Sequence, residues 1–358
     1  GYISKLSCNI GDKNSNEDNC YHVVYADGHD QLDASTLIDG FTITGGNANA
    51  INLPHSNGGG MYISESSPEI RNIIFSDNNA LESGGGVYLQ ESFSTISDCT
   101  VDGNSATYGG GLYTDHSPLV LSDSIILSNK ARLGGGLCFI ESAPRLDSNK
   151  ISANEESRFG GGIFSHLSTP DINNTIISDN LAKHDGGGIT SSHFDREALI
   201  TIRNSQIRSN IARHDKEPIG KGGGAYFYKQ TSAIINTAIQ ENFALNSGGG
   251  LYFSAAAYDI VNSSFFENRS SQKGGAIYSI GGGFSDVINS VFHKNESNKG
   301  SAIYMYAEAP LTTENEQGQA ETVGNPFNIA NSTFHGNTSD ETGDIFVESS
   351  ELRMTNSI

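Results

Sequence analysis

The sequence of 358 residues contains no tryptophan, few methionines and prolines, and no apolar run long enough to form a membrane-spanning helix. Basic residues are also scarce, because 21 lysines and arginines stand against 41 aspartates and glutamates, a formal net charge of −20. An acidic chain without a basic cluster argues against nucleic acid as a partner. No segment keeps the 3.6-residue apolar period of a helix for two turns, so the sequence predicts an all-β protein.

Cysteine is scarce as well, with four residues in the chain. Cys8 and Cys20 are close enough in sequence to close a small N-terminal loop in an oxidising compartment. Cys99 and Cys138 fall in different columns of the repeat described below, more than one coil apart, so we expect no bond between them. Cys138 takes the place of an aromatic residue, which suits a packed free thiol.

Glycine, in contrast, is abundant, and triplets of it recur at a nearly fixed interval, each followed by an aliphatic and commonly an aromatic residue. Apart from one step of 36 residues, the interval is 25 or 26 residues. Such a period indicates one supersecondary unit that buries its apolar face only by stacking on its neighbours. The triplets begin at Gly58, Gly84, Gly109, Gly134, Gly160, Gly186, Gly222 and Gly248, and degenerate copies begin at Gly274 and Gly300.

Short apolar segments recur with the same period, are rich in β-branched and aromatic residues, and are separated by Gly, Asn, Ser or Pro, which is typical of strands. We predict a parallel β-helix, a solenoid with three short strands per coil, coils about 4.8 Å apart, and roughly eleven coils of about 25–26 residues. Residues 1–36 lead into this solenoid or cap it, and residues 37–358 form it. Because the last repeat is incomplete, we expect the solenoid to continue beyond the C-terminus.

Two columns of polar residues accompany the strands. Stacked amides at equivalent corners can hydrogen-bond along the axis, although the simpler interpretation is that they support turns. The first column is Asn78, Asn104, Asn129, Asn154, Asn180, Asn210, Asn242, Asn268, Asn295 and Asn337. The second, six residues earlier in most coils, is Asn72, Asp98, Asp123, Asn174, Asn204, Asn236, Asn262, Asn289 and Asn331.

Three short segments resemble the paired GGAI and FxxN repeats of chlamydial polymorphic outer-membrane proteins. They are residues 274–277 (GGAI), 265–268 (FFEN) and 292–295 (FHKN). Those proteins belong to the wider class of right-handed parallel β-helices in the pectin-lyase-like superfamily, and residues 37–48 look like large secreted bacterial surface proteins of that class. The resemblance implies a right-handed parallel β-helix and a location that is extracellular or at the cell surface.

The most suggestive candidate site lies beside the long repeat step. Two polar runs follow equivalent asparagines in consecutive coils and should stack roughly 5 Å apart. They are Lys183, His184 and Asp185 in one coil and Arg213, His214 and Asp215 in the next, with Arg132 and Arg158 at nearby corners of preceding coils. The resemblance to polysaccharide lyases implies a Lys or Arg base that removes a proton from a uronic acid, while a cation such as Ca²⁺ neutralises the sugar carboxylate. The alternative is a solvated corner whose ion pairs contribute no more than about 1 kcal/mol.

Two further groups are candidate cation sites. Glu65, Glu91, His116 and Glu141 stand seven residues after the first glycine of successive triplets, with His193 two coils later. These residues have two interpretations. They form a Ca²⁺ or acid–base site, or they form an exposed polar ladder. Because like charges repel, both alternatives predict raised carboxylate pKa values or bound cations. Asp12, Asn14, Asn16 and Asp18 alternate as the oxygen ligands of a calcium loop do, although Glu17 replaces the expected glycine, so a polar turn is the alternative.

An aromatic column follows the inward aliphatic one, so strand alternation points it away from the core. Such a column, with Tyr226 and Tyr252 among its members, offers flat faces to sugars or to another protein, or it shields the sheet by stacking on itself. The column is Tyr62, Tyr88, Tyr113, Phe164, Tyr226, Tyr252, Tyr278 and Tyr304.

Taken together, the regularity of the coils favours a secreted or cell-surface structural or adhesive β-helix: an adhesin, a stalk, or an element of a matrix or filament. The expected partners are polysaccharides, surface proteins of a host or neighbour, and further copies of the chain. The alternative is a polysaccharide lyase or glycan-binding module that acts on an acidic polysaccharide. We expect no cofactor other than Ca²⁺.

Overall fold

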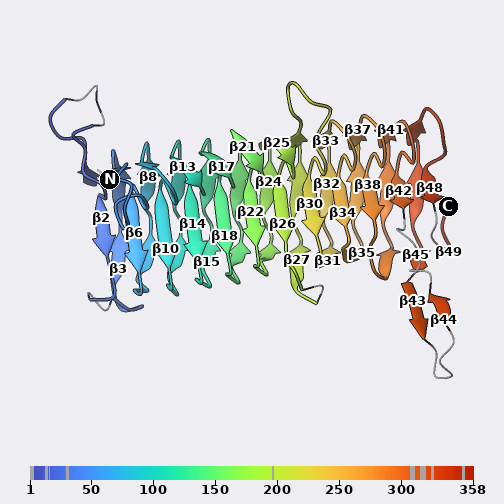
Figure 1. Ribbon diagram of the computed structural model, residues 1–358, viewed down its shortest axis with the longest axis horizontal. Coiled ribbons are helices and arrows are strands. Elements are labelled where there is room, and N and C mark those ends of the chain that lie inside the picture. The colour runs from blue at the N-terminus through green and yellow to red at the C-terminus, as the bar shows by residue number, and fades with distance from the viewer. Residues whose placement is uncertain are drawn as a thin grey trace. The chain divides into compact units, whose positions relative to one another are not determined.

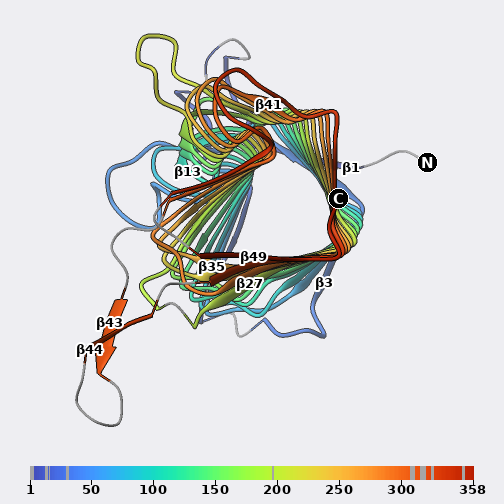
Figure 2. The same cartoon turned by 90° about the vertical axis from the view of Figure 1, so that its right-hand side faces the viewer.

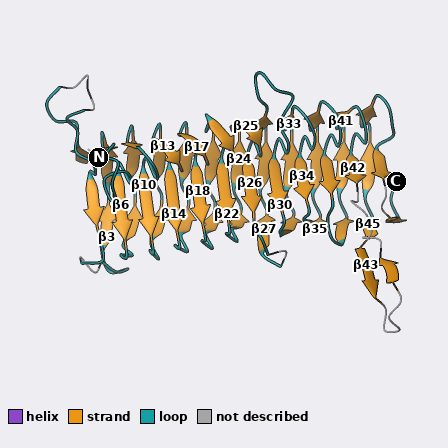
Figure 3. Cartoon of the chain, in the orientation of Figure 1, coloured by secondary structure: helices purple, strands orange, loops and turns teal. Residues whose placement is uncertain are grey.

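The computed structural model describes residues 4–12, 15, 17–29, 32–195, 197–306, 311–314, 320–323, 326–348 and 351–358. Every regular element within these residues is a strand, and Figure 3 shows strands joined by loops with no helix in the described part of the chain. The all-β prediction is confirmed. Accordingly, no described helix is long and apolar enough to cross a membrane.

The chain divides into two compact units. One comprises Gly1–Lys183 and Gly188–Ser191, and the other comprises His184–Gly187 and Ser192–Ile358. The strands in each unit belong to four parallel sheets, A to D, and β25 (Leu181–Asp185) and β26 (Ile189–Ser192) contain residues of both units.

In the first unit each sheet takes its strands from successive coils, and Figure 1 shows β6, β10, β14 and β18 of one sheet side by side. Sheet A contains β1 (Ser4–Ser7), β4 (Phe41–Thr44), β8 (Ile74–Ser76), β12 (Thr100–Asp102), β16 (Ile125–Leu127), β20 (Lys150–Ser152) and β24 (Ile176–Ser178). Sheet B contains β2 (Val24–Ala26), β6 (Met61–Ser64), β10 (Val87–Gln90), β14 (Leu112–Asp115), β18 (Leu137–Ile140) and β22 (Ile163–His166). Sheet C contains β3 (Leu37–Asp39), β7 (Glu69–Arg71), β11 (Thr95–Ser97), β15 (Val120–Ser122), β19 (Arg145–Asp147) and β23 (Asp171–Asn173). Sheet D contains β5 (Asn47–Ala48), β9 (Asn79–Ala80), β13 (Ser105–Tyr108), β17 (Lys130–Leu133) and β21 (Ser157–Phe159).

The second unit has the same organisation, and in Figure 2 its strands β27, β35 and β49, which share one sheet, lie along one side of the coil. Sheet A contains β28 (Gln206–Arg208), β32 (Ala238–Gln240), β36 (Ser264–Phe266), β40 (Val291–His293) and β46 (Thr333–His335). Sheet B contains β30 (Ala225–Tyr228), β34 (Leu251–Ser254), β38 (Ile277–Ile280), β42 (Ile303–Tyr306) and β48 (Ile345–Glu348). Sheet C contains β27 (Leu199–Arg203), β31 (Thr231–Ile235), β35 (Ala257–Val261), β39 (Ser285–Ile288), β45 (Pro326–Ala330) and β49 (Glu351–Thr355). Sheet D contains β29 (Ile211–Ala212), β33 (Phe243–Ala244), β37 (Arg269–Ser270), β41 (Glu296–Ser297) and β47 (Thr338–Ser339). An antiparallel hairpin of β43 (Leu311–Glu314) and β44 (Ala320–Val323) stands apart from these sheets.

Equivalent residues of successive coils pair in register, as the parallel β-helix requires. Val87 pairs with Met61 on one side and with Leu112 on the other. The apolar residues Phe75 and Val101, which pair in successive coils, are completely buried. The prediction of a parallel β-helix is therefore confirmed.

The prediction of three strands per coil is wrong, because a fourth strand lies between the asparagine column and the glycine triplet. In β13 and β17, for example, Ser105 pairs with Lys130 and Tyr108 pairs with Leu133. These strands are mostly polar, and Ala131 is the buried residue of β17. One small inward side chain is too weak an apolar signal for the alternation that identifies strands in a sequence.

The two polar columns have different roles. Members of the second column, such as Asn72 and Asp98, adopt a left-handed backbone with φ near 50° at exposed corners, a conformation that short Asn and Asp side chains tolerate. The first column is buried and hydrogen-bonded from coil to coil: the Nδ2 atom of Asn78 donates to Oδ1 of Asn104 at 3.0 Å, and that of Asn104 donates to Oδ1 of Asn129 at 3.0 Å. Turn support holds for the second column, and the first forms an asparagine ladder.

The glycine triplets occupy a corner where successive coils approach closely. Gly84, the first residue of its triplet, has φ of 64°, and a Cβ atom on Gly85 would overlap the carbonyl oxygens of Ser105 and Gly110. Backbone therefore packs directly on backbone at this edge, which favours glycine, although Ser301 takes the second position in the copy that begins at Gly300.

Candidate functional site

The two histidines of the basic candidate site lie together, as the repeat predicted. The ring centroids of His184 and His214 are 5.6 Å apart in an edge-to-face arrangement. Both side chains are half-buried, whereas Arg213 is exposed. The Nδ1 atom of His214 also accepts a hydrogen bond from the backbone N–H of Lys216 at 3.2 Å.

The predicted stacking of Asp185 on Asp215 is wrong. The bridge partner of Asp185 is Lys221, whose backbone N–H donates to the Asp185 carboxylate at 3.1 Å. The strand β29 ends at Ala212, and the inserted residues that include Asp215 loop out before the chain returns to the sheet. The insertion therefore shifts the register that the asparagine column suggested.

The remaining basic candidates lie in the first unit and are exposed. Arg132, on β17, and Arg158, on β21, occupy neighbouring strands of sheet D, because Leu133 pairs with Phe159. The Arg158 guanidinium lies 5.2 Å from the centroid of the Phe159 ring. Lys183 is exposed near the end of β25. These arginine and lysine side chains are available to a carboxylated ligand, and each is open to water.

The acidic column lies at a corner of the coil where sheet B turns towards sheet C. Glu65, Glu91, His116 and Glu141 all have left-handed backbones, with φ between 46° and 50°, and all are exposed. The imidazole of His116 contacts the carboxylates of Asp115 at 2.6 Å and Glu141 at 3.0 Å.

The electrostatics of this column centre on the histidine. The hydrogen bond and negative charge of Asp115, followed by the charge of Glu141, raise the pKa of His116. The column predicted from the sequence did not include Asp115, because Asp115 stands one residue before His116, which is the member of the column in that coil. Within the described residues, no group of three or more His, Cys, Asp or Glu side chains converges on a point that could hold a metal ion. Ca²⁺ binding by the column stays a prediction.

The N-terminal calcium candidate is only partly described. The backbone N–H of Asp12 donates to the carboxylate of Asp18 at 2.9 Å, which closes the loop on itself. Asn14 and Asn16 lie outside the described residues. Cys8 and Cys20 form a disulfide around the loop, while Cys99 and Cys138 are free and buried. The expectation that Cys99 and Cys138 do not bond to each other is therefore confirmed, and the loop closure that the sequence left open at Cys8 and Cys20 is present.

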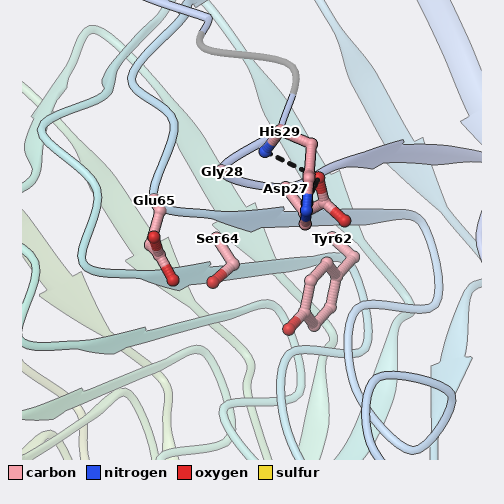
Figure 4. A pocket seen from close by; sticks show the side chains of 6 residues that line it. All are labelled: Asp27, Gly28, His29, Tyr62, Ser64 and Glu65. Atoms are coloured by element: carbon pink, nitrogen blue, oxygen red, sulfur yellow. Dashed lines mark hydrogen bonds and ion pairs between the residues drawn. The ribbon is translucent and has the colours of Figure 1, made fainter.

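A pocket that the repeat pattern did not indicate lies near the N-terminal end of sheet B and has a volume of about 350 Å³ (Figure 4). The Asp27 carboxylate accepts hydrogen bonds from the backbone N–H of His29 and the hydroxyl of Tyr25, each at 3.0 Å, and these bonds lower its pKa. The pocket is lined by Asp27, Gly28, His29, Tyr62, Ser64 and Glu65.

The aromatic column stacks on itself. In the first unit the ring centroids of Tyr62 and Tyr88 are 5.0 Å apart, and in the second those of Tyr226 and Tyr252 are 5.2 Å apart. The exposed fraction of Tyr252 is 6%, and the Nζ atom of Lys221 lies 5.3 Å from its ring centroid. The structure thus favours shielding of the sheet by stacked rings, and it offers a ligand little of the flat ring face at Tyr252.

The chain's fold and repeats agree with a known family. The sequence matches the family described as a right-handed beta helix region over residues 7–193, just over half of its length. The chain belongs to the right-handed β-helix family. Within this β-helix, residues 262–280 also match the repeat of the Chlamydia polymorphic membrane proteins, which confirms the resemblance at residues 265–268 (FFEN) and 274–277 (GGAI).

Two solved structures are similar to this chain. A double mutant of the periplasmic alginate epimerase AlgG is 10% identical, with a TM-score of 0.36, and the match covers 93% of this chain and 84% of the epimerase. The Dettilon tailspike protein is 12% identical, with a TM-score of 0.35, and the match covers 87% of this chain and 60% of the tailspike. No curated protein sequence matches the chain.

Proposed function

We propose that this β-helix is a structural and adhesive element that is secreted or displayed on a cell surface. The observation that supports this role best is the use of side chains for holding successive coils together. Buried asparagines such as Asn104 and stacked rings such as Tyr88 connect each coil to its neighbours. A solenoid stabilised at every repeat is suited to present a long surface or to bear load.

The disulfide supports the extracellular part of the proposal. Cys8 and Cys20 are joined, and disulfides persist mainly in oxidising compartments outside the cytosol. The buried cysteines Cys99 and Cys138 are free in the same chain, so their thiols serve as an internal reference when the oxidation state of Cys8 and Cys20 is measured.

The compartment is tested by differential thiol labelling of the protein isolated from its natural source under acid quench. After denaturation without reductant, Cys99 and Cys138 should label fully, while Cys8 and Cys20 should label only after reduction. Surface display is tested by antibody binding to intact cells and to the medium. Full labelling of Cys8 and Cys20 without reductant, together with protein confined to the cell interior, would refute the proposal.

The second candidate is a polysaccharide lyase or glycan-binding module acting on an acidic polysaccharide. The observation that favours it is the contact between the rings of His184 and His214 beside the exposed Arg213. Release of unsaturated uronides from pectate or alginate is the test, with Lys183→Ala and Arg213→Ala as variants. Uronide release by the wild type that disappears in either variant would establish catalysis. No uronide release by the wild type would refute the lyase and favour the structural role.

A further inference from the structure

Two histidines from separate segments of the first unit meet beside the first strand of sheet B. His22 lies two residues before β2, and His55 lies in the loop between β5 and β6, which is longer than the equivalent connection between β9 and β10. Nε2 of His22 is 3.3 Å from Nδ1 of His55, and the ring centroids are 5.5 Å apart. His22 is half-buried and His55 is exposed, so solutes can reach the pair.

The surrounding contacts fix the tautomer of His22. Its Nδ1 atom lies 3.0 Å from the carbonyl oxygen of Gly58. A carbonyl oxygen only accepts hydrogen bonds, so Nδ1 carries the proton. The lone pair of the neutral ring is therefore on Nε2, the atom that faces His55. Histidines that bind metal ions commonly donate their other ring N–H to a backbone carbonyl or a carboxylate in the same way.

Both rings are held in place without a ligand. The ring of Tyr21 stacks on His55 with a centroid separation of 4.5 Å, and the ring of Tyr62 lies 5.4 Å from that of His22. The disulfide at Cys20 anchors the chain two residues before His22. A site that needs little reorganisation keeps more of its gross interaction energy on binding.

The separation of the two nitrogens fits a shared zinc ion. Zn²⁺ binds imidazole nitrogen at about 2.0–2.1 Å and favours tetrahedral coordination. Two nitrogens 3.3 Å apart that share an ion at that distance form an angle of about 105–110° at the metal, close to the tetrahedral value. Without a metal, the same contact is a hydrogen bond in which Nδ1 of His55 donates to Nε2 of His22.

We propose that His22 and His55 bind one Zn²⁺ ion, with Nε2 of His22 and Nδ1 of His55 as its ligands. His55 then carries its proton on its other nitrogen, so neither neutral ring has to release a proton. Two protein ligands do not close a tetrahedral site, and water or the oxygen atoms of a ligand fill the remaining positions. The net charge of −20 favours the approach of a cation.

This site differs in chemistry from the calcium candidates of the acidic column and the N-terminal loop. Imidazole nitrogen suits zinc and related transition-metal ions, whereas Ca²⁺ takes oxygen ligands. An excess of Ca²⁺ should therefore leave zinc on the histidine pair. The inference does not depend on the proposed structural role, since a metal ion can bind here whatever the β-helix does.

Calorimetric titration of the whole chain with zinc chloride measures the site. We expect His55→Ala and His22→Ala each to weaken zinc binding by at least tenfold, because a change in the second shell of a metal ligand alone costs about 10–100-fold in affinity. The matched control is His29→Asn, which should leave the affinity unchanged because the His29 side chain is 95% exposed. Circular dichroism checks that the variants fold, and if His22→Ala does not, the exposed loop residue His55 decides the question.

NMR of the imidazole nitrogens separates a metal site from a hydrogen-bonded pair. One equivalent of zinc should shift the Nε2 resonance of His22 and the Nδ1 resonance of His55 together, with no shift at His29. A chain that does not bind zinc, or that binds it equally well after His55→Ala, overturns the inference. A shift at only one of the two rings, or at His116 in their place, also overturns it, and the second result assigns the ion to the acidic column.

Discussion

The asparagine ladder makes a strong quantitative prediction at Asn104. Its side chain makes four buried hydrogen bonds: it accepts from the backbone N–H and from Nδ2 of Asn78, and it donates to Oδ1 of Asn129 and to the carbonyl oxygen of Phe75. Asn104 is completely buried, so water cannot replace these bonds without opening the coil. We therefore expect Asn104→Ala to destabilise the fold considerably.

The magnitude follows from which groups keep a partner. Nδ2 of Asn78 still donates to the carbonyl oxygen of Ile43, and Oδ1 of Asn129 still accepts from the backbone N–H of residue 104. The backbone N–H of Asn78 loses its partner, whereas the carbonyl oxygen of Phe75 loses the bond from Asn104 but stays in the parallel ladder of β8 and β12. At about 1–3 kcal/mol for one buried group deprived of its partner, the free energy of unfolding should fall by about 1–3 kcal/mol.

Guanidinium denaturation followed by circular dichroism measures this change. The matched control is Asp98→Asn in the same coil, because Asp98 is an exposed corner residue with φ of 53° and Asn tolerates that conformation. The control should change the free energy of unfolding by less than about 0.5 kcal/mol. A loss below about 1 kcal/mol in Asn104→Ala would show that the ladder bonds contribute little net stability, against the reasoning above.

Two further predictions concern the glycine corner and the N-terminal coil. Gly85→Ala should lower the melting temperature, because its Cβ atom would overlap the carbonyl oxygens of Ser105 and Gly110; a melting temperature equal to that of the wild type would refute the close approach of the coils. Burial, with the neighbouring charge of His55, lowers the pKa of His22, so the folded state favours the neutral ring and its stability should fall as the pH drops below about 6.5 towards the folded-state value. Hydrogen exchange of the backbone amides of β2 and β6 measures this loss of stability. The His29→Asn control should show the same loss, because the His29 side chain is 95% exposed. A free energy of opening that stays constant between about pH 7 and pH 5 would contradict the prediction.

The repeated residues made the fold predictable. A position that recurs in every coil, such as the Gly85 or Asn104 position, meets the same neighbours in the coils before and after it. Period and residue type together then define a parallel register, and the left-handed corners at Asn72 and Asp98 follow from the same argument. The stacking of His184 and His214 was likewise predictable, because each follows an asparagine of the column at the same distance.

The exceptions to the repeat needed the tertiary structure. An insertion has no equivalent in the neighbouring coil, so only the folded chain shows that Asp185 meets Lys221 instead of Asp215. The fourth strand was missed because its pairing depends on backbone bonds and one small buried residue, which leave almost no apolar pattern. The sequence shows that Cys138 stands in an aromatic column, but an apolar hollow of about 350 Å³ lined by Tyr113, Ile140 and Phe164, among others, arises from how side chains pack across several coils. Periodicity therefore determined the architecture of this chain, and three-dimensional packing decided where that architecture departs from its repeat.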